Sequence, residues 1–154
     1  MEIFRLVREK WSLNLSGKGA ALMGGRWNAK GTELIYCAQN RSLAMAEVSV
    51  HMKVDQMKMI NLKMLTIYVP DRLKCLEVSE EDLVYNWKEF PHPKSTQDIG
   101  DRIVIENKYC LVKVPSVVVS GDFNYLINPN HKDFSKIKII DTVKFPFDKR
   151  IFFK

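Results

Sequence analysis

A glycine-rich stretch near the N-terminus constrains this chain more than any other segment. Residues Leu15–Gly31 read LSGKGAALMGGRWNAKG and hold five glycines in seventeen positions. Glycine loses more backbone entropy on folding than any other residue, so such a cluster indicates sharp turns or something that approaches the backbone closely. Within it, Arg26 offers a planar guanidinium that suits phosphate or carboxylate groups. The stretch is either an irregular loop with a surface arginine or a loop that binds an anionic, nucleotide-like ligand.

Two common phosphate-binding motifs come close to matching this stretch, and both fail. The dinucleotide fingerprint GxGxxG begins at Gly17 and Gly19, but Leu22 stands where the third glycine is required. The P-loop spacing begins at Gly19, but Gly25 stands where the lysine is required. Neither match precedes a clear helical pattern. We therefore reject the Rossmann and P-loop folds.

Length and composition predict one domain that spans residues 1–154. The chain is 46% hydrophobic and 27% charged, which is ordinary for a globular protein. No apolar run approaches the roughly 18 residues that a membrane span needs, and the N-terminal residues lack a signal-peptide core, so we expect a cytoplasmic protein without membrane contact. The three cysteines are odd in number and far apart, which fits neither a disulfide framework nor a metal site. We expect reduced thiols and no metal.

The formal net charge of +6 favours anionic partners. The lysines are scattered, however, and no arginine-rich segment or interleaving of aromatic and basic residues marks a nucleic-acid groove. A small polyanion or an acidic protein is therefore at least as good a candidate partner as nucleic acid. We expect no direct contact with nucleic acid.

Hydrophobic patterns predict more strands than helices, without regular alternation of the two. We expect the glycine-rich stretch to be a loop, Asn40 or Ser42 to cap the first helix, and Pro115 to mark a break, bulge or edge. The expected strands are Glu2–Val7, Thr32–Ala38, Ile60–Val69, Tyr109–Val119, Lys136–Val143 and Phe145–Phe153. The expected helices are Ser42–Val54, Ser79–Phe90, and Thr96–Glu106 with an interruption at Gly100. This order is typical of a mixed, β-rich α+β domain.

Arg26, Tyr36, Glu47 and Ser116 together suit cleavage of an N-glycosidic bond to a positively charged nicotinamide. Because that leaving group departs neutral, the reaction needs no general acid and no pair of carboxylates. One carboxylate suffices to stabilise an oxocarbenium-like transition state, while an arginine binds pyrophosphate or ribose and an aromatic ring packs the nicotinamide. The plainer alternative is that Glu47 is a solvated or paired helix residue and Tyr36 a core aromatic.

Several motifs spread over nearly the whole chain carry a resemblance to a known family. The sequence SGKGAALMGGRWNAKG precedes LIYCA and SLAMAEVSVH, and STQDIGD, VPSVVVS, NYLINPNH and FPFDKRIF follow. The GGRWN-x-x-G element, a downstream AxxE helix and an NP-x-H segment form a specific combination. With these elements the chain resembles the RES-domain toxins of bacterial toxin–antitoxin systems, which are named for an arginine, a glutamate and a serine.

The resemblance implies an NAD-consuming toxin with a fold similar to the ADP-ribosyltransferases. Arg26 matches the family arginine that orients NAD, Glu47 the catalytic glutamate, and Tyr36 the tyrosine of the pocket. Ser116 matches the family serine because it follows Pro115 in a VPS context, although Ser120, where many members have proline, is an alternative.

The resemblance also suggests further pocket residues. We expect His51 and Asn124 to line the pocket or to support residues that line it. Gly25 and Arg5 are expected to contribute to NAD binding.

The resemblance leaves the acceptor open. The expected reaction is that of an NAD phosphorylase, in which NAD and inorganic phosphate give nicotinamide and ADP-ribose 1''-phosphate, with no prosthetic group. The first alternative is a protein ADP-ribosyltransferase that modifies a cellular enzyme. The second is a non-catalytic module that binds an antitoxin or nucleic acid. The expected partner is an Xre-type helix-turn-helix antitoxin that blocks the active site.

Overall fold

The described part of the chain, residues 1–52, 61–148 and 150 of a computed structural model, is built on one sheet. Seven strands follow each other across it in the order β4-β5-β6-β2-β1-β3-β7, and only the β4–β5 pair is parallel. The strands are β1 (Glu2–Arg8), β2 (Ile35–Ala38), β3 (Leu62–Tyr68), β4 (Cys75–Glu77), β5 (Leu111–Pro115), β6 (Phe123–Ile127) and β7 (Lys138–Lys144). The α-helices of the described residues are α1 (Lys18–Met23), α2 (Arg41–His51) and α4 (Lys94–Glu106).

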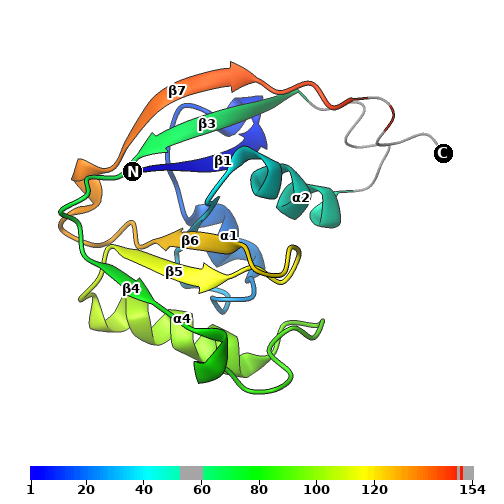
Figure 1. The fold of residues 1–154 in the computed structure, drawn as a ribbon. Coiled ribbons are helices and arrows are strands. Elements are labelled where there is room, and N and C mark those ends of the chain that lie inside the picture. Colours follow the sequence, from blue (N-terminus) through cyan, green and yellow to red (C-terminus); the bar gives the residue numbers. More distant parts are fainter. Residues whose placement is uncertain (53–60, 149, 151–154) are drawn as a thin grey trace.

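The sheet consists of two halves that meet at a narrow seam. Strands β1, β3 and β7 form one half and β4, β5, β6 and β2 the other, as Figure 1 shows. The two halves are joined by β1 and β2, whose register rests on the single pair Phe4 and Ala38. In contrast, β1 and β3 pair along seven residues. Helix α2 packs beside this seam (Figure 1).

Helices α2 and α4 cover the same face of the sheet, one over each half. Leu43 and Ala44 of α2 pack with Phe4 and Leu6 of β1. Helix α4 packs against the other half through a cluster that contains the buried Trp27, Trp87, Val112, Val114 and Leu126, with Ile99 and Ile103 of α4 beside it. Helix α2 begins where the Asn40 side chain accepts a hydrogen bond from the Leu43 amide at 2.7 Å, which is N-terminal capping.

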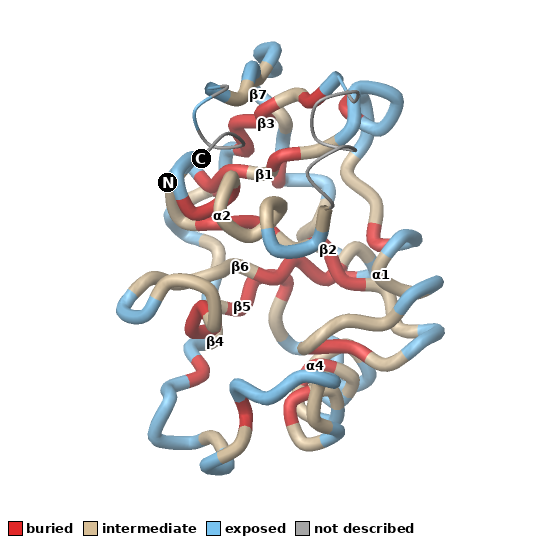
Figure 2. The backbone as a smooth tube through the Cα atoms, turned by 90° about the vertical axis from the view of Figure 1, so that its right-hand side faces the viewer, coloured by how far each residue is buried: buried red, intermediate tan, exposed pale blue. Residues whose placement is uncertain are grey.

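The opposite face of the sheet carries the third core cluster. Its buried members come from both halves of the sheet and include Ile3, Cys37, Leu65, Ile67, Leu111 and Ile127. Figure 2 shows the buried segments running along the strands, whereas the outer turns are exposed. Because successive side chains of a strand point to opposite faces, each of β1, β2, β3, β5 and β6 contributes to a cluster on either side.

The observed fold confirms the expected α+β class and corrects several helix boundaries. The glycine-rich stretch contains the short helix α1. The predicted helix Ser79–Phe90 is wrong, since only the 3₁₀ helix Glu80–Asp82 forms there. Ser79 and Asp82 do form a capping box, but the chain then turns so that Trp87 is buried against Trp27. Tertiary burial therefore overrides the local helical signal.

Other predicted elements also differ from the structure. Helix α4 runs through Gly100 without a break. Strand β5 ends at Pro115, as the proline predicts, but β4 and β6 were not expected as strands. Residues 145–148 form no strand, and the remainder of the segment predicted to extend to Phe153 lies largely outside the described residues. Val54 and Ile60, predicted ends of a helix and a strand, also lie outside them. No helix in the described part is long and apolar enough to cross a membrane.

Candidate active site

The Glu47 carboxylate forms the centre of a hydrogen-bonded cluster at the seam. Glu47 lies on α2, and its Oε1 atom accepts a hydrogen bond from Ser116 Oγ at 2.9 Å and another from Asn124 Nδ2. No described residue donates to Oε2. Ser116 directly follows β5, and Asn124 lies on β6 where it pairs with Ala38 of β2. One carboxylate oxygen is therefore fixed by the protein while the other has no protein donor among the described residues.

Ser116 is itself held rigidly. The Val118 and Val119 amides donate to its Oγ at 3.1 Å each, and its own amide donates to the Asp122 carbonyl at 2.9 Å. The hydroxyl thus accepts two backbone hydrogen bonds, and its single proton points to Glu47. Pro115 is the last residue of β5, so Ser116 is the first residue of the connection between β5 and β6.

Arg26 lies within electrostatic range of Glu47. Burial lowers the pKa of its guanidinium, and interactions with Glu47 and Tyr36 partly offset this effect. Burial raises the pKa of Tyr36, whose hydroxyl donates to Asn28 Oδ1 at 2.6 Å and accepts from the Trp27 amide at 3.0 Å. Tyr36 therefore fixes the backbone beside Arg26, a role that its residue type alone did not indicate.

The Arg26 guanidinium also holds a distant segment of chain. It donates to the carbonyls of Trp87, Lys88 and Glu89, the last at 3.1 Å. The Trp27 and Trp87 rings contact each other with centroids 6.3 Å apart. Three of the five guanidinium N–H donors thus have acceptors within the described part of the chain, and the other two have none there.

His92 follows this segment and was not singled out from the sequence. Burial lowers its pKa, and the charges of Arg26 and His51 lower it further. Its Nδ1 atom is buried and has no hydrogen-bond partner among the described residues. His51 is exposed and lies one helical turn after Glu47. The only sequence signal for His92 is a histidine between Pro91 and Pro93, and this signal is weak.

Arg5 does not join this cluster. Phe4 pairs with Ala38, and Ala38 pairs with Asn124, so these residues share the face that α2 covers. Arg5 follows Phe4 in β1 and points to the opposite face, where Cys37 is its electrostatic neighbour and burial lowers the pKa of the guanidinium. Strand alternation therefore separates Arg5 from Glu47, contrary to the expectation that it lines the same pocket.

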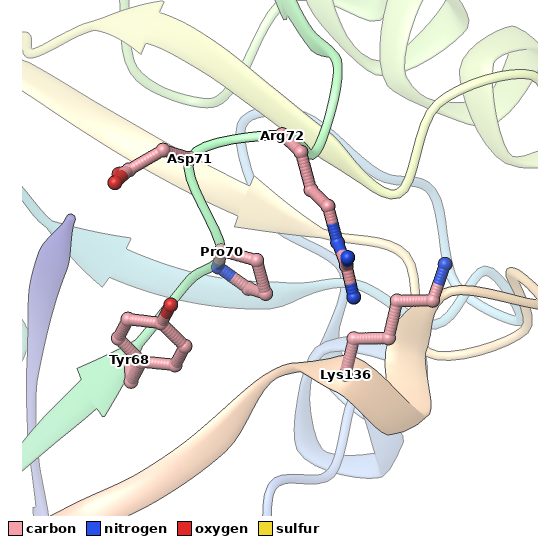
Figure 3. Close-up of a pocket in the computed structure, with 5 residues that line it drawn as sticks. All are labelled: Tyr68, Pro70, Asp71, Arg72 and Lys136. Carbon is pink, nitrogen blue, oxygen red and sulfur yellow. The ribbon is translucent and has the colours of Figure 1, made fainter.

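A surface pocket lies away from the Glu47 cluster. A shallow, open pocket is lined by Tyr68, Pro70, Asp71, Arg72 and Lys136, as Figure 3 shows. Its Asp71 carboxylate pairs with the N-terminal ammonium at 2.6 Å. None of the side chains singled out from the sequence lines this pocket.

Within the described residues, no group of three or more His, Cys, Asp or Glu side chains is arranged to hold a metal.

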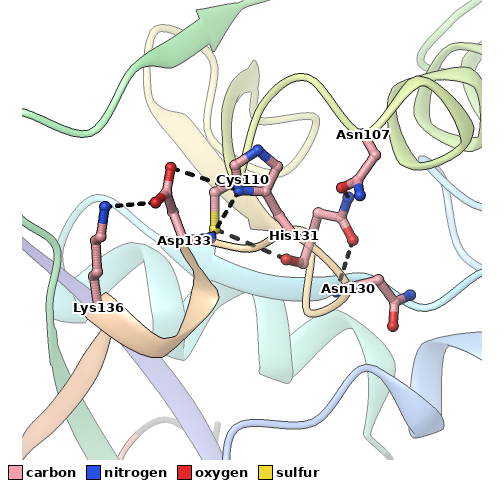
Figure 4. A network of polar contacts seen from close by, with 7 residues as sticks. Asn107, Cys110, Asn130, His131, Asp133 and Lys136 are labelled. Atoms are coloured by element: carbon pink, nitrogen blue, oxygen red, sulfur yellow. Dashed lines mark hydrogen bonds and ion pairs between the residues drawn. The ribbon is translucent and has the colours of Figure 1, made fainter.

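The NP-x-H segment ties the end of β6 to the end of α4. Asn128 donates to Asn107 Oδ1 at 2.9 Å and accepts from the Asn130 amide at 3.0 Å. His131 Nδ1 accepts from the Asp133 amide at 3.1 Å, within the network of Figure 4. Buried Asn128 and His131 thus satisfy backbone groups of their own turn and the Asn107 side chain at the end of α4, which indicates a structural role for this motif.

The structure therefore brings Glu47, Ser116 and Asn124 into direct contact and places Arg26 in electrostatic range of them. Gly25 lies against the Tyr36 hydroxyl, where an added Cβ atom would stand 2.7 Å from the hydroxyl oxygen. Ser116 rather than Ser120 contacts Glu47, since Ser120 is exposed in the following turn.

Comparisons with known proteins extend over nearly the whole chain. The RES domain family model matches residues 2–148. A "Toxin Res" of Yersinia enterocolitica is 33% identical over 153 residues, which cover 98% of this chain and 99% of that protein. A "Prs ADP-ribosylating toxin" of a Sphingobium species is 35% identical over 140 residues, which cover 90% of this chain and 86% of that protein.

A solved structure supports the fold. A chain in the crystal structure of the M. tuberculosis MbcT–MbcA toxin–antitoxin complex matches with a TM-score of 0.76 and 21% sequence identity. The match covers 94% of this chain and 83% of that chain.

Proposed function

This chain belongs to the RES domain family, and on that premise we propose that it is a toxin that cleaves the bond between nicotinamide and ribose in NAD. The observation that carries the proposal is the Glu47 carboxylate. Ser116 and Asn124 donate hydrogen bonds to its Oε1 atom, and no described residue donates to its Oε2 atom. A fixed negative charge with one unpaired oxygen suits a ribose whose anomeric carbon becomes positive in the transition state.

The chemistry needs few protein groups. As the bond between the anomeric carbon and the nicotinamide nitrogen breaks, its electron pair neutralises the positive pyridinium nitrogen. Glu47 stabilises the resulting oxocarbenium character and holds a ribose hydroxyl through Oε2. The two unused N–H donors of Arg26 bind the pyrophosphate. Tyr36 and Gly25 shape the loop that carries Arg26, and His51 flanks the site.

We propose inorganic phosphate as the acceptor. One of its oxygens forms a bond to the anomeric carbon as the bond to nicotinamide breaks, so the products are nicotinamide and ADP-ribose 1''-phosphate. The net charge of +6 favours both anionic substrates. A protein acceptor is the second candidate because one relative bears the name of an ADP-ribosylating toxin. The same residues serve both reactions, since only the nucleophile differs.

The decisive experiment measures nicotinamide release from NAD by the purified protein, with and without inorganic phosphate. Phosphate-dependent release with formation of ADP-ribose 1''-phosphate supports the phosphorylase. Release that requires cell lysate, together with a mass increase of a lysate protein, supports transfer to protein. No release from folded protein in buffer, with phosphate or with lysate contradicts NAD cleavage and leaves a binding module.

Glu47→Gln tests the central residue. Glutamine keeps the shape and accepts the same two hydrogen bonds but removes the charge, so we expect kcat to fall about 100-fold or more. Glu33→Gln, a change of a glutamate outside the cluster, serves as the control and leaves kcat unchanged. Near-full activity of the Glu47 variant would exclude this glutamate from catalysis.

A partner follows from the same premise. We propose that an Xre-type helix-turn-helix antitoxin covers the Glu47 cluster and blocks NAD. In support, the solved structure with the same fold is that of a toxin–antitoxin complex. Co-purification with the antitoxin is expected to abolish nicotinamide release, and its removal by unfolding and refolding is expected to restore the activity.

A further inference from the structure

Helix α4 contacts the Arg26 loop at three points. Gln97 Nε2 donates to the Gly25 carbonyl at 2.9 Å, and Asp101 Oδ1 accepts from the Ala29 amide at 3.0 Å. Between them, the Trp27 carbonyl lies so close to Gly100 that an added Cβ atom would stand 1.6 Å from its oxygen. Positions 97, 100 and 101 share one helix face, because residues three and four apart are neighbours on a helix surface.

The loop is held from its other side as well. The Tyr36 hydroxyl accepts the Trp27 amide and donates to Asn28 Oδ1. The Asn28 amide group in turn donates to the carbonyls of Ala20, Ala29 and Thr32, at distances between 2.9 and 3.0 Å. The peptide groups on both sides of Arg26 are therefore fixed, the Gly25 carbonyl by α4 and the Trp27 amide by Tyr36. The direction of the Arg26 side chain follows from these contacts.

We propose that Gln97 and Asp101 are positioning residues that hold Arg26 in register for NAD. This inference rests on the function proposed above. The two side chains belong to the STQDIGD motif, whose part in the function was otherwise unassigned. Neither residue contacts Glu47 in the structure. Both act through the backbone of residues 25–29, and Gly100 allows the close approach that puts them within hydrogen-bond distance.

The proposal predicts a particular kinetic signature. Arg26 binds the pyrophosphate in the substrate and in the transition state alike, so loss of its position weakens uniform binding and raises KM while kcat stays nearly unchanged. The expected rise in KM is about tenfold, the effect of losing one hydrogen bond to a fixed group. A merely structural role would lower the amount of active enzyme, and hence the apparent kcat, without moving KM.

Asp101 offers a matched series of variants. Asp101→Ala removes the acceptor for the Ala29 amide and is expected to raise KM for NAD about tenfold. Asp101→Asn keeps an oxygen at the same position and is expected to restore KM to within about twofold of the original. Asp98 lies on the same helix, is exposed and has no polar partner among the described residues. Asp98→Ala controls for the loss of an acidic residue and leaves KM unchanged. Gln97→Met, which has similar length but no donor, reproduces the effect of Asp101→Ala.

A double variant tests whether the effect passes through Arg26. Lysine cannot reproduce the guanidinium fork, so Arg26→Lys also raises KM. When Arg26 is already lysine, Asp101→Ala is expected to add less than a further threefold, because the group it positions is gone. If the effects of Arg26→Lys and Asp101→Ala on KM are fully additive, the proposal is overturned. It is also overturned if Asp101→Ala leaves KM unchanged, or if Asp98→Ala raises KM as much as Asp101→Ala does. A lack of nicotinamide release by the unsubstituted protein would instead contradict the proposed function, and this role with it.

Discussion

Arg26 shows how one side chain serves two distant parts of the molecule. Its position in a glycine-rich stretch left two interpretations open from sequence, an anion-binding residue or a surface arginine. The three carbonyls it holds, those of Trp87, Lys88 and Glu89, lie more than sixty residues further along the chain. Such a contact depends on the tertiary fold and leaves no local pattern, so it could not be predicted. The sequence singled out Glu47 by its residue type and by the family resemblance, but not its hydrogen bonds with Ser116 and Asn124, which are 69 and 77 residues away.

His92 provides a prediction about pH at the residue scale. Its pKa lies below the ordinary value of 6.5, because of burial first and of the charges of Arg26 and His51 second. Between the lowered pKa and 6.5, the unfolded chain binds more protons than the folded one, so folding stability decreases as the pH falls through this window. We expect His92→Gln to flatten this decrease, as measured by urea unfolding between pH 7.5 and 5. Identical pH profiles for both proteins would contradict the prediction.

Elements with local signals were predicted best. Helix α2 has an N-cap and an apolar stripe within its own sequence, and it forms nearly where expected. The acidic start of the segment after Ser79 also forms a capped turn, but burial of Trp87 and the Arg26 contacts prevent further helix. Strand β6 was missed because its sequence, FNYLI, alternates too briefly to stand out. Competition between local and tertiary interactions explains these differences.

Two helical glycines allow a prediction at the scale of elements. A Cβ atom at Gly100 would overlap the Trp27 carbonyl oxygen, so Gly100→Ala has to push α4 away from the loop. We expect it to lower the free energy of unfolding by about 1–3 kcal/mol. Gly19 in α1 has open space around it, and Gly19→Ala is expected to raise the free energy of unfolding by about 0.4–1 kcal/mol.

Urea unfolding at pH 7 of the two glycine variants and the unsubstituted protein measures both effects. The opposite signs of the two changes separate a packing cause from a difference in helix propensity, which would make both substitutions stabilising. A stabilised Gly100→Ala protein would mean that α4 and the Trp27 carbonyl are not in close contact.

At the scale of the whole molecule, the site lies where the two halves of the sheet meet. Helix α2 over one half contributes Glu47, and the adjoining ends of β5 and β6 in the other half contribute Ser116 and Asn124 (Figure 1). The composition and strand count predicted the α+β class but not the strand order, because the order depends on pairings between remote segments. The pairing of Phe4 with Ala38 likewise depends on remote segments, and through strand alternation it makes Arg5 face away from the site.

The reactivity of the three cysteines tests how well the sheet face opposite Glu47 is shielded from solvent. Cys37 and Cys110 are buried in the cluster on the face opposite Glu47, and burial raises the pKa of their thiols to about 12 and about 11. Cys75 is exposed on the edge strand β4, and partial burial raises the pKa of its thiol as well, so its exposure is what distinguishes it. Because the thiolate is the reactive form, iodoacetamide at pH 8 is expected to alkylate Cys75 first, with all three thiols reacting only in urea.

Mass spectrometry of the native protein after short exposure to iodoacetamide measures this difference, and Cys75→Ser is expected to remove the early adduct. Cys75 pairs with Leu111 at the start of β5, whereas Ser116 follows the end of that strand, so its alkylation should leave nicotinamide release unchanged. Early modification of Cys37 would mean that the face opposite the site opens readily in the native protein. In that case the fixed positions of Phe4, Ala38 and Asn124 at the seam, on which the Glu47 cluster depends, would not hold.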